Sequence, residues 1–575
     1  MRHPLPSGEY DAVVIGAGIS GLTSAAILAR AGLKVCVLEM DARPGGYLAG
    51  FRRKDFRFDS AIHWLNQCGP RGYVTRVFDL IGRDHPVARP QRRIRRWKSP
   101  SVDLLLTDRP DDLKAELIRR FPHERAGLER FFRDAWKLGR SFDRSSGLIR
   151  AQETMGPLER AAYLLRRLRF ALPFIKHLGY QGDTGVKKGL DRYFTDPGLH
   201  KLFSSEQELL ACLVPIGWAY FGDYQSPPKG GSQVFPEWLA HVVTRLGGAL
   251  HYRCRVTRIL LEGGRCVGVE GEQRGAPFTV RATQVIAACD VETLYERMLP
   301  PEVVPETLKA KLRDAVLYSS SVTVSLGLDV PAEHFGLDEE LIYLHRDDVP
   351  RDAHGGTDPA QSGISILAPS LRDKSMAPPG MGTLTLYIPA LFTDHDTWAT
   401  ERDATGALVR GEAYERLKQR VADALIDRVE RALAPGLRSH IVYCDVATPI
   451  THWRYTGNRF GSMMGAKPGK ENFKAGIAHY RTPVPGLLLG GHWADLGGGV
   501  PIAVKSGVNT ALIVLKDTGH PAFATWRDYL DKGLDVERVR TGPGLVPYAE
   551  DWVRTPTPAE KRALRGDVDP DGEEA

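Results

Sequence analysis

The amino-acid sequence predicts an α/β protein in which one parallel-sheet unit is assembled from separated pieces of the chain, with a second unit inserted between them. Two glycine-rich turns, at 16–21 and 490–501, each follow a short apolar run and precede an apolar helix. Between them, the pattern over 250–287 predicts a three-stranded β-meander. Strand–turn–helix units of this kind build open sheets with helices on both faces.

Length and composition suit a folded, multidomain chain. The 575 residues correspond to about three folding units at roughly 100–200 residues each. A hydrophobic fraction of 42% excludes wholesale disorder, and a net charge of +7 is too dilute over this length to indicate a nucleic-acid partner. The seven cysteines include no C-x-x-C pair and no zinc-type spacing, so we expect a reduced, cytoplasmic chain with no bound metal.

The first glycine-rich turn has the context of a nucleotide site. A buried strand over 10–15 leads into it, a helix over 22–31 follows, and a second strand over 34–38 ends at Glu39. This is G-x-G-x-x-G between strand and helix, with an acid about twenty residues on. The glycines allow a tight turn and let a pyrophosphate approach the backbone closely, and the helix N-terminus favours a phosphate. The Glu39 carboxylate would accept hydrogen bonds from the ribose hydroxyls. The sequence therefore predicts a Rossmann-like site formed by Gly16, Ala17, Gly18, Ser20, Gly21 and Glu39.

A second glycine pair favours FAD over NAD. The acidic strand is followed by Met40, Arg43 and Gly45-Gly46, a segment that resembles the piece running beside the flavin diphosphate in flavoproteins with two dinucleotide domains. We find no second G-x-G-x-x-G in the chain, so a separate NAD(P)H domain is not expected.

The C-terminal glycine cluster repeats the geometry. A strand over 485–489 precedes the turn, and a helix over 502–515 follows it. Three consecutive glycines at 497–499 carry an entropic cost unless a ligand must approach the backbone closely, and the turn offers N–H groups to an anion or an electron-rich ring. The meander strands are expected at 250–259, 265–269 and 279–287. The cofactor contacts predicted from these regions are Val256 beside the adenine, Asp495, Gly499, Val500, Pro501 and Ser506.

With these blocks in place, the sequence resembles the phytoene desaturase, carotenoid isomerase and retinol saturase family of FAD-dependent oxidoreductases over about residues 11–515. The resemblance rests on Gly45-Gly46 with FRFDSAIH at 56–63, on PPKGGS at 227–232, on the stretch 447–462, and on GGVP at 498–501. One departure is His492, where many related flavoproteins carry an Asp that holds the ribityl chain. Asp495 is the candidate for that role here, and the alternative is that backbone contacts hold the ribityl chain.

The resemblance implies an enzyme that exchanges a hydride between flavin N5 and a polyene or isoprenoid, in desaturation, saturation or cis–trans isomerisation of C=C bonds. His63 is the candidate for proton transfer, with a satisfied core histidine as the alternative. Arg454 and Tyr455, with Asn458, form a polar cluster that either orients a substrate end group or caps a strand. Two other functions stay open: an amine- or amino-acid-type flavin oxidase, and a non-catalytic lipid-binding protein on the same fold.

Residues 158–178, LERAAYLLRRLRFALPFIKHL, set basic side chains among Leu, Ala and Phe. That composition is typical of a helix lying in a membrane interface, and the alternative is a core helix with a solvated basic face. Pro173 predicts a break in it. The basic run RPQRRIRRWK at 89–98 adds weaker support. Without a signal peptide or a spanning run, we expect contact with a membrane surface only, and the oligomeric state stays open.

The elements predict a discontinuous FAD-binding domain from 8–66, 228–300 and 475–518. The remaining pieces, 67–227 and 301–474, would form a substrate-binding domain with a mixed sheet that contains strands over 319–328 and 383–391. Residues 519–575 are expected to be an appendix whose acidic end, DVDPDGEEA, is disordered.

Overall fold

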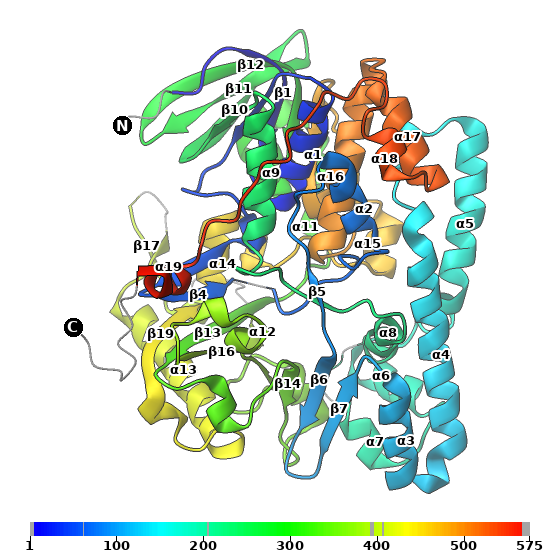
Figure 1. Ribbon diagram of the computed structural model, residues 1–575, viewed down its shortest axis with the longest axis vertical. Coiled ribbons are helices and arrows are strands. Elements are labelled where there is room, and N and C mark those ends of the chain that lie inside the picture. The colour runs from blue at the N-terminus through cyan, green and yellow to red at the C-terminus, as the bar shows by residue number, and fades with distance from the viewer. Residues whose placement is uncertain are drawn as a thin grey trace.

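The computed structural model describes residues 5–60, 62–203, 206, 208–390, 396–404 and 408–565. The expected disorder of the last residues lies outside this range. Two seven-stranded sheets organise the molecule, one above the other in Figure 1, with a column of helices along one side.

The first sheet has the order β10-β11-β12-β1-β2-β9, and β20 also pairs with β12. Strands β1, β2, β9, β12 and β20 pair in parallel, while β10, β11 and β12 form an antiparallel meander. Its strands are β1 (Glu9–Ile15), β2 (Val35–Leu38), β9 (Ala249–His251), β10 (Cys254–Glu262), β11 (Arg265–Gln273), β12 (Ala276–Ala287) and β20 (Leu487–Leu489).

Helix α1 (Ile19–Arg30) packs between α9 (Val234–Arg245) and α16 (Gly499–Asp517), side by side in Figure 1. Every residue of α1 is buried. A Cβ at Gly507 would lie 2.5 Å from the Ser20 carbonyl oxygen, so this glycine allows α16 to approach α1 closely. The close approach brings the second glycine-rich turn next to the first.

The second sheet has the order β19-β13-β16-β15-β14-β6-β7, with α13 (Glu412–Ala432) packed on its core. Its strands are β6 (Arg93–Lys98), β7 (Asp103–Thr107), β13 (Ser320–Leu328), β14 (Leu341–Leu344), β15 (Ile364–Leu367), β16 (Gly382–Ala390) and β19 (Ile441–Ala447). A helical layer with its own core adjoins β6 and β7. The layer contains α3 (Pro110–Arg120), α4 (Arg125–Asp143), α5 (Pro157–Ile175), α6 (Gly182–Leu190), α7 (Pro197–Lys201) and α8 (Leu209–Tyr220).

Smaller elements complete the described fold. They include β3 (Gly50–Arg53), β4 (Phe56–Asp59), β5 (Arg89–Pro90), β8 (Gln225–Ser226), β17 (Glu401–Arg402), β18 (Leu408–Val409), α2 (Tyr73–Ile81), α10 (Val291–Thr293), α11 (Glu306–Arg313), α12 (Pro369–Arg372), α14 (Pro449–Thr456), α15 (Lys470–Ala475), α17 (Ala522–Lys532), α18 (Val536–Val539) and α19 (Pro558–Arg565).

The single strand expected over 250–259 is wrong. The chain forms β9, which extends the parallel edge beside β2, and then β10, which belongs to the meander. Arg253 between them has a φ of +58°, a left-handed conformation that interrupts a strand. The break expected at Pro173 is also wrong, because α5 continues to Ile175. Helix α16 begins three residues earlier than expected, at Gly499, so its first turn belongs to the glycine cluster.

The C-terminal segment after α16 is part of the fold rather than a loose appendix. Trp526 and Tyr529 of α17 are buried in the core around the first sheet. Beyond α18 the chain runs past α9 to α19, which contacts β4 in the lower half of Figure 1. Helix α16 is, among the described residues, the one helix long and apolar enough to cross a membrane, but 67% of its apolar window is buried inside the protein. A core helix of a folded domain explains it.

Candidate functional site

One large cavity, of about 1980 Å³, extends from the N-terminus of α1 to the helical layer. Sites for drug-sized ligands occupy about 300–1000 Å³, so this cavity is large enough for a dinucleotide and a second, elongated molecule. Its two ends differ in chemistry. Glycine backbone and Glu39 line one end, and aromatic rings from α4, α5 and α8 line the other.

At the nucleotide end, backbone geometry requires glycine. Gly16 has a φ of +100°, and a Cβ at Gly21 would lie 2.1 Å from the Gly16 carbonyl oxygen. Gly18 faces open space and is the N-cap of α1, with no side chain capping the helix. The first N–H groups of α1 are therefore presented to the cavity, where they favour a phosphate.

Glu39 is fixed beside this helix end. Its Oε2 accepts a hydrogen bond from the Ala17 N–H at 2.7 Å, and its Oε1 accepts one from the Asp41 N–H at the same distance. Burial raises the pKa of the carboxyl above its usual value, and the backbone hydrogen bonds oppose that rise. The carboxylate is held in one orientation at the end of β2, where it fits the ribose of a dinucleotide.

Three glycine segments meet around this end. The Gly45 N–H donates to the Ala17 carbonyl at 2.9 Å, and the Gly491 N–H donates to Ser20 Oγ at 3.0 Å. A Cβ at Gly498 would overlap Met464 Sδ, at 1.8 Å. The first and third segments lie 471 residues apart in the sequence at the Ser20–Gly491 contact, and together with the second they form one backbone-lined cradle, which a flavin dinucleotide fits.

Most of the predicted cofactor residues lie on the cavity wall. They are Gly16, Gly18, Ser20, Gly21, Glu39, Met40, Gly45, Gly46, Val256, Asp495, Gly499, Val500 and Pro501. Ala17, Arg43 and Ser506 are not among the lining residues. The Ser506 hydroxyl is buried and has no hydrogen-bond partner within the described part of the chain. Ser506 lies on the second turn of α16 and faces the protein interior, which the sequence pattern alone does not reveal.

Asp495 is already occupied by protein partners. Its Oδ2 lies 2.8 Å from Lys505 Nζ and accepts from the Tyr480 hydroxyl at 3.1 Å. His492, the residue in the usual acidic position, also lines the cavity, and burial lowers the pKa of its imidazole to about 4. Where related flavoproteins carry an Asp, this cavity therefore has a neutral imidazole, and the nearby carboxylate of Asp495 is already paired with a lysine.

His63 lines the cavity and stacks on Tyr387, with ring centroids 4.0 Å apart. Burial, together with the nearby Arg372, lowers the pKa of His63 to about 3, so the imidazole is neutral near pH 7. Its Nδ1 is buried without a partner among the described residues. A neutral imidazole at this place can accept or return a proton only when a substrate reaches it.

The predicted polar cluster, which starts on α14 and continues just past its end, divides into two parts. Arg454 and Tyr455 lie at the exposed rim of the cavity, and Tyr455 is 58% exposed. Asn458 is buried, and its Nδ2 donates to the Tyr47 hydroxyl at 3.0 Å and to the Ser462 carbonyl at 3.2 Å. The rim residues are placed to meet a ligand, while Asn458 holds neighbouring loops together.

The aromatic end was not found from the sequence. Phe142 of α4 packs edge-to-face on Phe174 of α5 and on Trp218 of α8, with centroid distances of 5.3 and 5.5 Å. Phe170 lies 5.1 Å from Phe174. The same wall also contains Leu178, Leu210 and Val214. The rings come from three helices that are up to about seventy residues apart, so local periodicity does not show that they converge.

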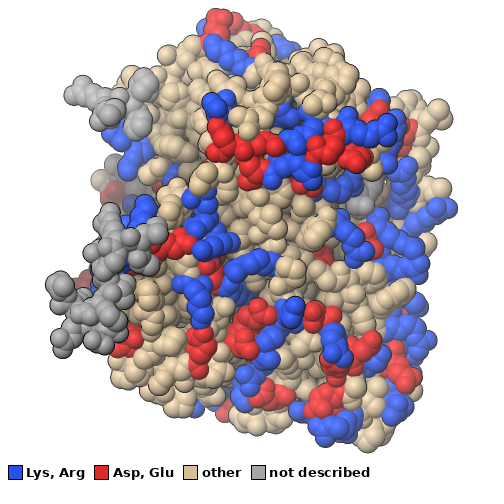
Figure 2. Space-filling view, viewed as in Figure 1, with Lys and Arg blue, Asp and Glu red and all other residues tan. Residues whose placement is uncertain are grey.

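Helix α5 forms one wall of this end and is exposed on its other sides. The side chains of Tyr163, Phe170 and Phe174 face the cavity, yet none of the 19 residues of α5 is buried. The exposed apolar side chains of this region are Leu158, Leu164, Leu165, Leu168, Leu172, Ile175 and Leu178, each 47–87% exposed. Figure 2 shows Lys and Arg side chains along the edge where Figure 1 places α4 and α5.

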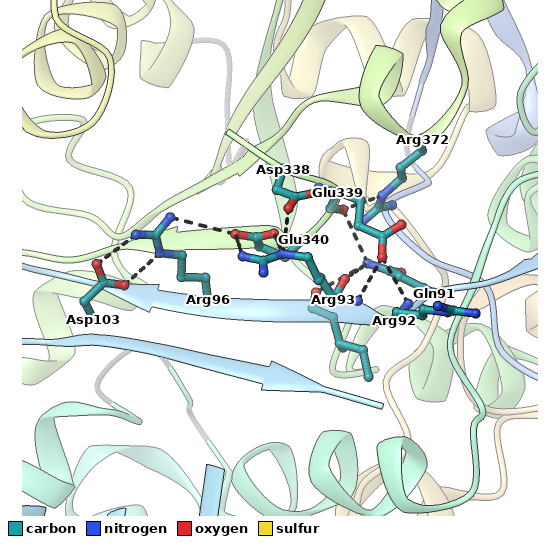
Figure 3. Close-up of polar contacts among 10 residues, drawn as sticks. Gln91, Arg92, Arg93, Arg96, Asp103, Asp338, Glu339, Glu340 and Arg372 are labelled. Atoms are coloured by element: carbon teal, nitrogen blue, oxygen red, sulfur yellow. Dashed lines mark hydrogen bonds and ion pairs between the residues drawn. The ribbon is translucent and has the colours of Figure 1, made fainter. Parts of the chain in front are cut away.

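The basic run 89–98, in contrast, is paired inside the protein. Arg93 of β6 contacts the buried Glu340 through Nε at 2.7 Å, and Arg96 binds Asp103 of β7 through two hydrogen bonds (Figure 3). Arg95 points to the other side of the strand and pairs with Glu206 at 3.2 Å. The charges of Arg93, Arg95 and Arg96 are therefore used within the fold, and this part of the run does not support membrane contact.

Comparisons with known proteins agree with this site. A model of the flavin containing amine oxidoreductase family matches residues 19–515. The chain belongs to this family. It is 26% identical to a chloroplastic prolycopene isomerase of Daucus carota over 89% of this chain and 81% of that one. It is 25% identical to an all-trans-retinol 13,14-reductase of Danio rerio over 84% and 82% of the two chains.

Solved structures show the same fold. An oxidoreductase from Methanosarcina mazei superposes with a TM-score of 0.54 at 18% identity, and putrescine oxidase bound to putrescine gives 0.54 at 16%. Both matches cover 89% of this chain and all of the other. The protein is an FAD-dependent oxidoreductase, and the nucleotide end of the cavity is the part that fits its cofactor.

Proposed function

We propose that this flavoenzyme acts on C=C bonds of a polyene or isoprenoid that it takes from a membrane surface. The observation that carries the proposal is the aromatic end of the cavity, walled by Phe142, Phe170, Phe174 and Trp218 and continuous with the cofactor end. A long apolar molecule gains about 25 cal/mol for each Å² that it buries there. The relatives that act on prolycopene and retinol are consistent with this substrate class.

Bound FAD supplies hydride exchange with a substrate carbon atom. The chain itself supplies alignment and exclusion of water: the aromatic walls orient a flat, conjugated substrate along the cavity. We propose His63 as the group that moves a proton at the neighbouring carbon, because it lines the cavity, its Nδ1 is buried without a partner among the described residues, and stacking on Tyr387 holds its ring in place.

An amine substrate is less well served at the aromatic end. An unpaired carboxylate would bind a cationic amine most strongly, but Glu208 pairs with Lys467 at 2.6 Å. Asp223 accepts hydrogen bonds from the Gln67 backbone at 2.6 Å and from its side-chain amide at 2.7 Å. Both carboxylates are engaged, so the aromatic end favours a neutral substrate.

Contact with a membrane follows from α5. Its exposed leucines can enter the acyl boundary while Arg166 and Arg169 meet anionic headgroups, and its inner face borders the cavity. We expect the FAD-loaded protein to float with vesicles that contain anionic lipid and to bind neutral vesicles more weakly. Absence from both vesicle fractions would remove the membrane from the proposal.

The deciding experiment is anaerobic photometry of the FAD-loaded protein mixed with polyenes, before and after chemical reduction. Bleaching of the oxidised flavin by a polyene identifies a desaturase. Conversion only after reduction identifies a saturase if the flavin is reoxidised stoichiometrically, and an isomerase if it is not. Bleaching by amines but by no polyene would overturn the proposal. The variant Gly18→Val, which blocks the cofactor cradle, is the colourless control.

A further inference from the structure

Arg150 is the most deeply buried arginine near the cavity that the cofactor and substrate regions leave unexplained. Its side chain is 1% exposed, and its guanidinium is shared between two carboxylates from distant parts of the chain. It pairs with Asp531 of α17 and, at 3.4 Å, with Glu159 in the first turn of α5. It also donates to the Thr154 carbonyl at 2.7 Å. These contacts satisfy Nη1 and Nη2, which offsets the cost of burying the charge, while the buried Nε has no hydrogen-bond partner among the described residues.

Glu159 connects this centre to the start of α5. Its Oε2 accepts a hydrogen bond from the Gly156 N–H at 2.8 Å, so the same carboxylate caps the helix and binds Arg150. Partial burial opposes ionisation, but the Gly156 hydrogen bond and Arg150 together lower the pKa of the Glu159 carboxyl. Arg150 is therefore one of two ties on the first turn of α5, the other being Arg160, whose Nε donates to the Gln152 carbonyl at 3.1 Å.

The segment that carries Arg150 is itself attached to the cofactor helix. Asn509 of α16 accepts a hydrogen bond from the Ala151 N–H at 2.7 Å and donates to the Ile149 carbonyl at 2.9 Å. Lys516 of the same helix donates to the Glu153 carbonyl at 2.8 Å. A continuous set of contacts thus runs from α16 and α17 to the first turn of α5.

The rest of α5 has few other attachments. Past its far end, Lys176 contacts Asp134 of α4 at 2.6 Å, and Phe170 and Phe174 pack on Phe142. Between the two ends no residue of the helix is buried. The position of this cavity wall is therefore set at its two ends.

We infer that Arg150 is a positioning residue, which clamps α5 in place as a wall of the substrate cavity by joining its first turn to the C-terminal helix α17. Asp531 lies outside the family match, which ends at residue 515, so the clamp is supplied by the segment that follows the flavin-binding core. The clamp is inferred from the contacts alone. Only the statement that this wall receives a membrane-borne substrate rests on the proposed function.

Hydrogen exchange of the FAD-loaded full chain, followed by mass spectrometry, tests the clamp. In Asp531→Asn we expect exchange over 157–175 to rise on the order of tenfold, while 499–517 changes less than about twofold. Asp531→Glu should restore slow exchange. Asp528→Asn is the matched control, because Asp528 lies on the same helix but pairs with Arg527 and Lys532 at the surface. Unchanged exchange of α5 in Asp531→Asn, or an equal rise in α16, would overturn the inference.

A second variant guards against misfolding. Glu159→Gln removes the half-exposed partner on α5 and leaves Asp531 in place, and the same local rise in exchange is expected. With a polyene presented in vesicles, Asp531→Asn should raise KM several-fold and leave kcat within about twofold, because the wall and not the reacting centre is disturbed. If the wild-type protein converts no polyene, the proposed function fails, and the exchange data still decide for or against the clamp.

Discussion

Two arginine-rich segments of this chain, residues 89–98 and helix α5, have similar composition and opposite surroundings. In the first, Arg93, Arg95 and Arg96 each contact a carboxylate, and β6 lies inside the second sheet. In the second, Arg166 and Arg169 form no ion pair with any described residue, Arg167 lines the cavity, and the leucines beside them are about half exposed. The arginines of the first segment are paired within the fold, whereas those on the outer face of α5 are unpaired and exposed to solvent or to a surface.

The comparison shows that the carboxylates that the fold places beside a basic run decide whether its charges are paired or exposed. Strand pairing places β6 between β7 and β14, and Asp103 and the acidic stretch 338–340 come with those two strands. Helix α5 packs mainly on α4, where Asp134 contacts Lys176, Lys137 and the Tyr193 hydroxyl but none of the arginines of α5 in the described structure. Unpaired arginines on the outer face, here Arg166 and Arg169, beside exposed leucines are typical of an interfacial helix.

The largest effect is expected from removing the buried acid of the first segment. Glu340→Ala should lower the free energy of unfolding by about 3 kcal/mol, since the fully buried Glu340 carboxylate is the shared partner of Arg93 and Arg96. Arg166→Ala on α5 is the matched control and should change it by less than about 0.5 kcal/mol. Urea unfolding followed by tryptophan fluorescence measures both. If the two variants lose a similar amount of unfolding free energy, the two segments do not differ in how much their charges stabilise the fold.

The reverse pattern is expected for vesicle binding. Leu165→Ser with Leu172→Ser should weaken partition into anionic vesicles by roughly 30-fold, because each half-exposed leucine loses about 1 kcal/mol of apolar transfer. The control is Val87→Ser, which alters a 68% exposed residue just before the first segment and should leave partition unchanged. Sedimentation of the protein with vesicles gives both values. Equal partition of the leucine variant and the wild type would show that α5 does not touch the membrane.

The cofactor cradle could be predicted because its information is local. Gly16, Gly18 and Gly21 sit within six residues between a strand and a helix, and their geometric demands can be derived without knowing the rest of the fold. The same holds for Glu39, which is the residue immediately after the end of β2. The role of Ser506 could not be derived, because the sequence does not specify which side of α16 faces the cavity.

The aromatic wall and the Arg150 clamp depend on contacts between distant parts of the chain. Arg150 and Asp531 are 381 residues apart, and neither has a local pattern that marks the other. Arg93 and Glu340 are 247 apart. A signal was available only for the second pair, since a strand rich in arginine needs acids on the strands beside it.

The smallest effect concerns the exposed end of the first segment, where Asp103 meets Arg96 and Lys98. Hydrogen bonds from Arg96 and then Lys98 outweigh partial burial and lower the pKa of Asp103 from 3.8 to about 2. Because the folded-state pKa lies below the unfolded one, the contribution of this carboxylate is complete above about pH 4 and is lost as the pH falls toward 2.

Its side chain is 42% exposed, so solvent screening limits the contribution to about 1 kcal/mol or less. The difference in unfolding free energy between the wild type and Asp103→Asn should therefore shrink steadily between about pH 5 and pH 2.5. Taking the difference removes the titration of all other carboxyl groups that the two proteins share. If this difference in unfolding free energy is constant over that range, the Asp103 ion pair does not cause it. The contrast in charge pairing between this segment and α5 would then rest on the buried Glu340 and Glu206 alone.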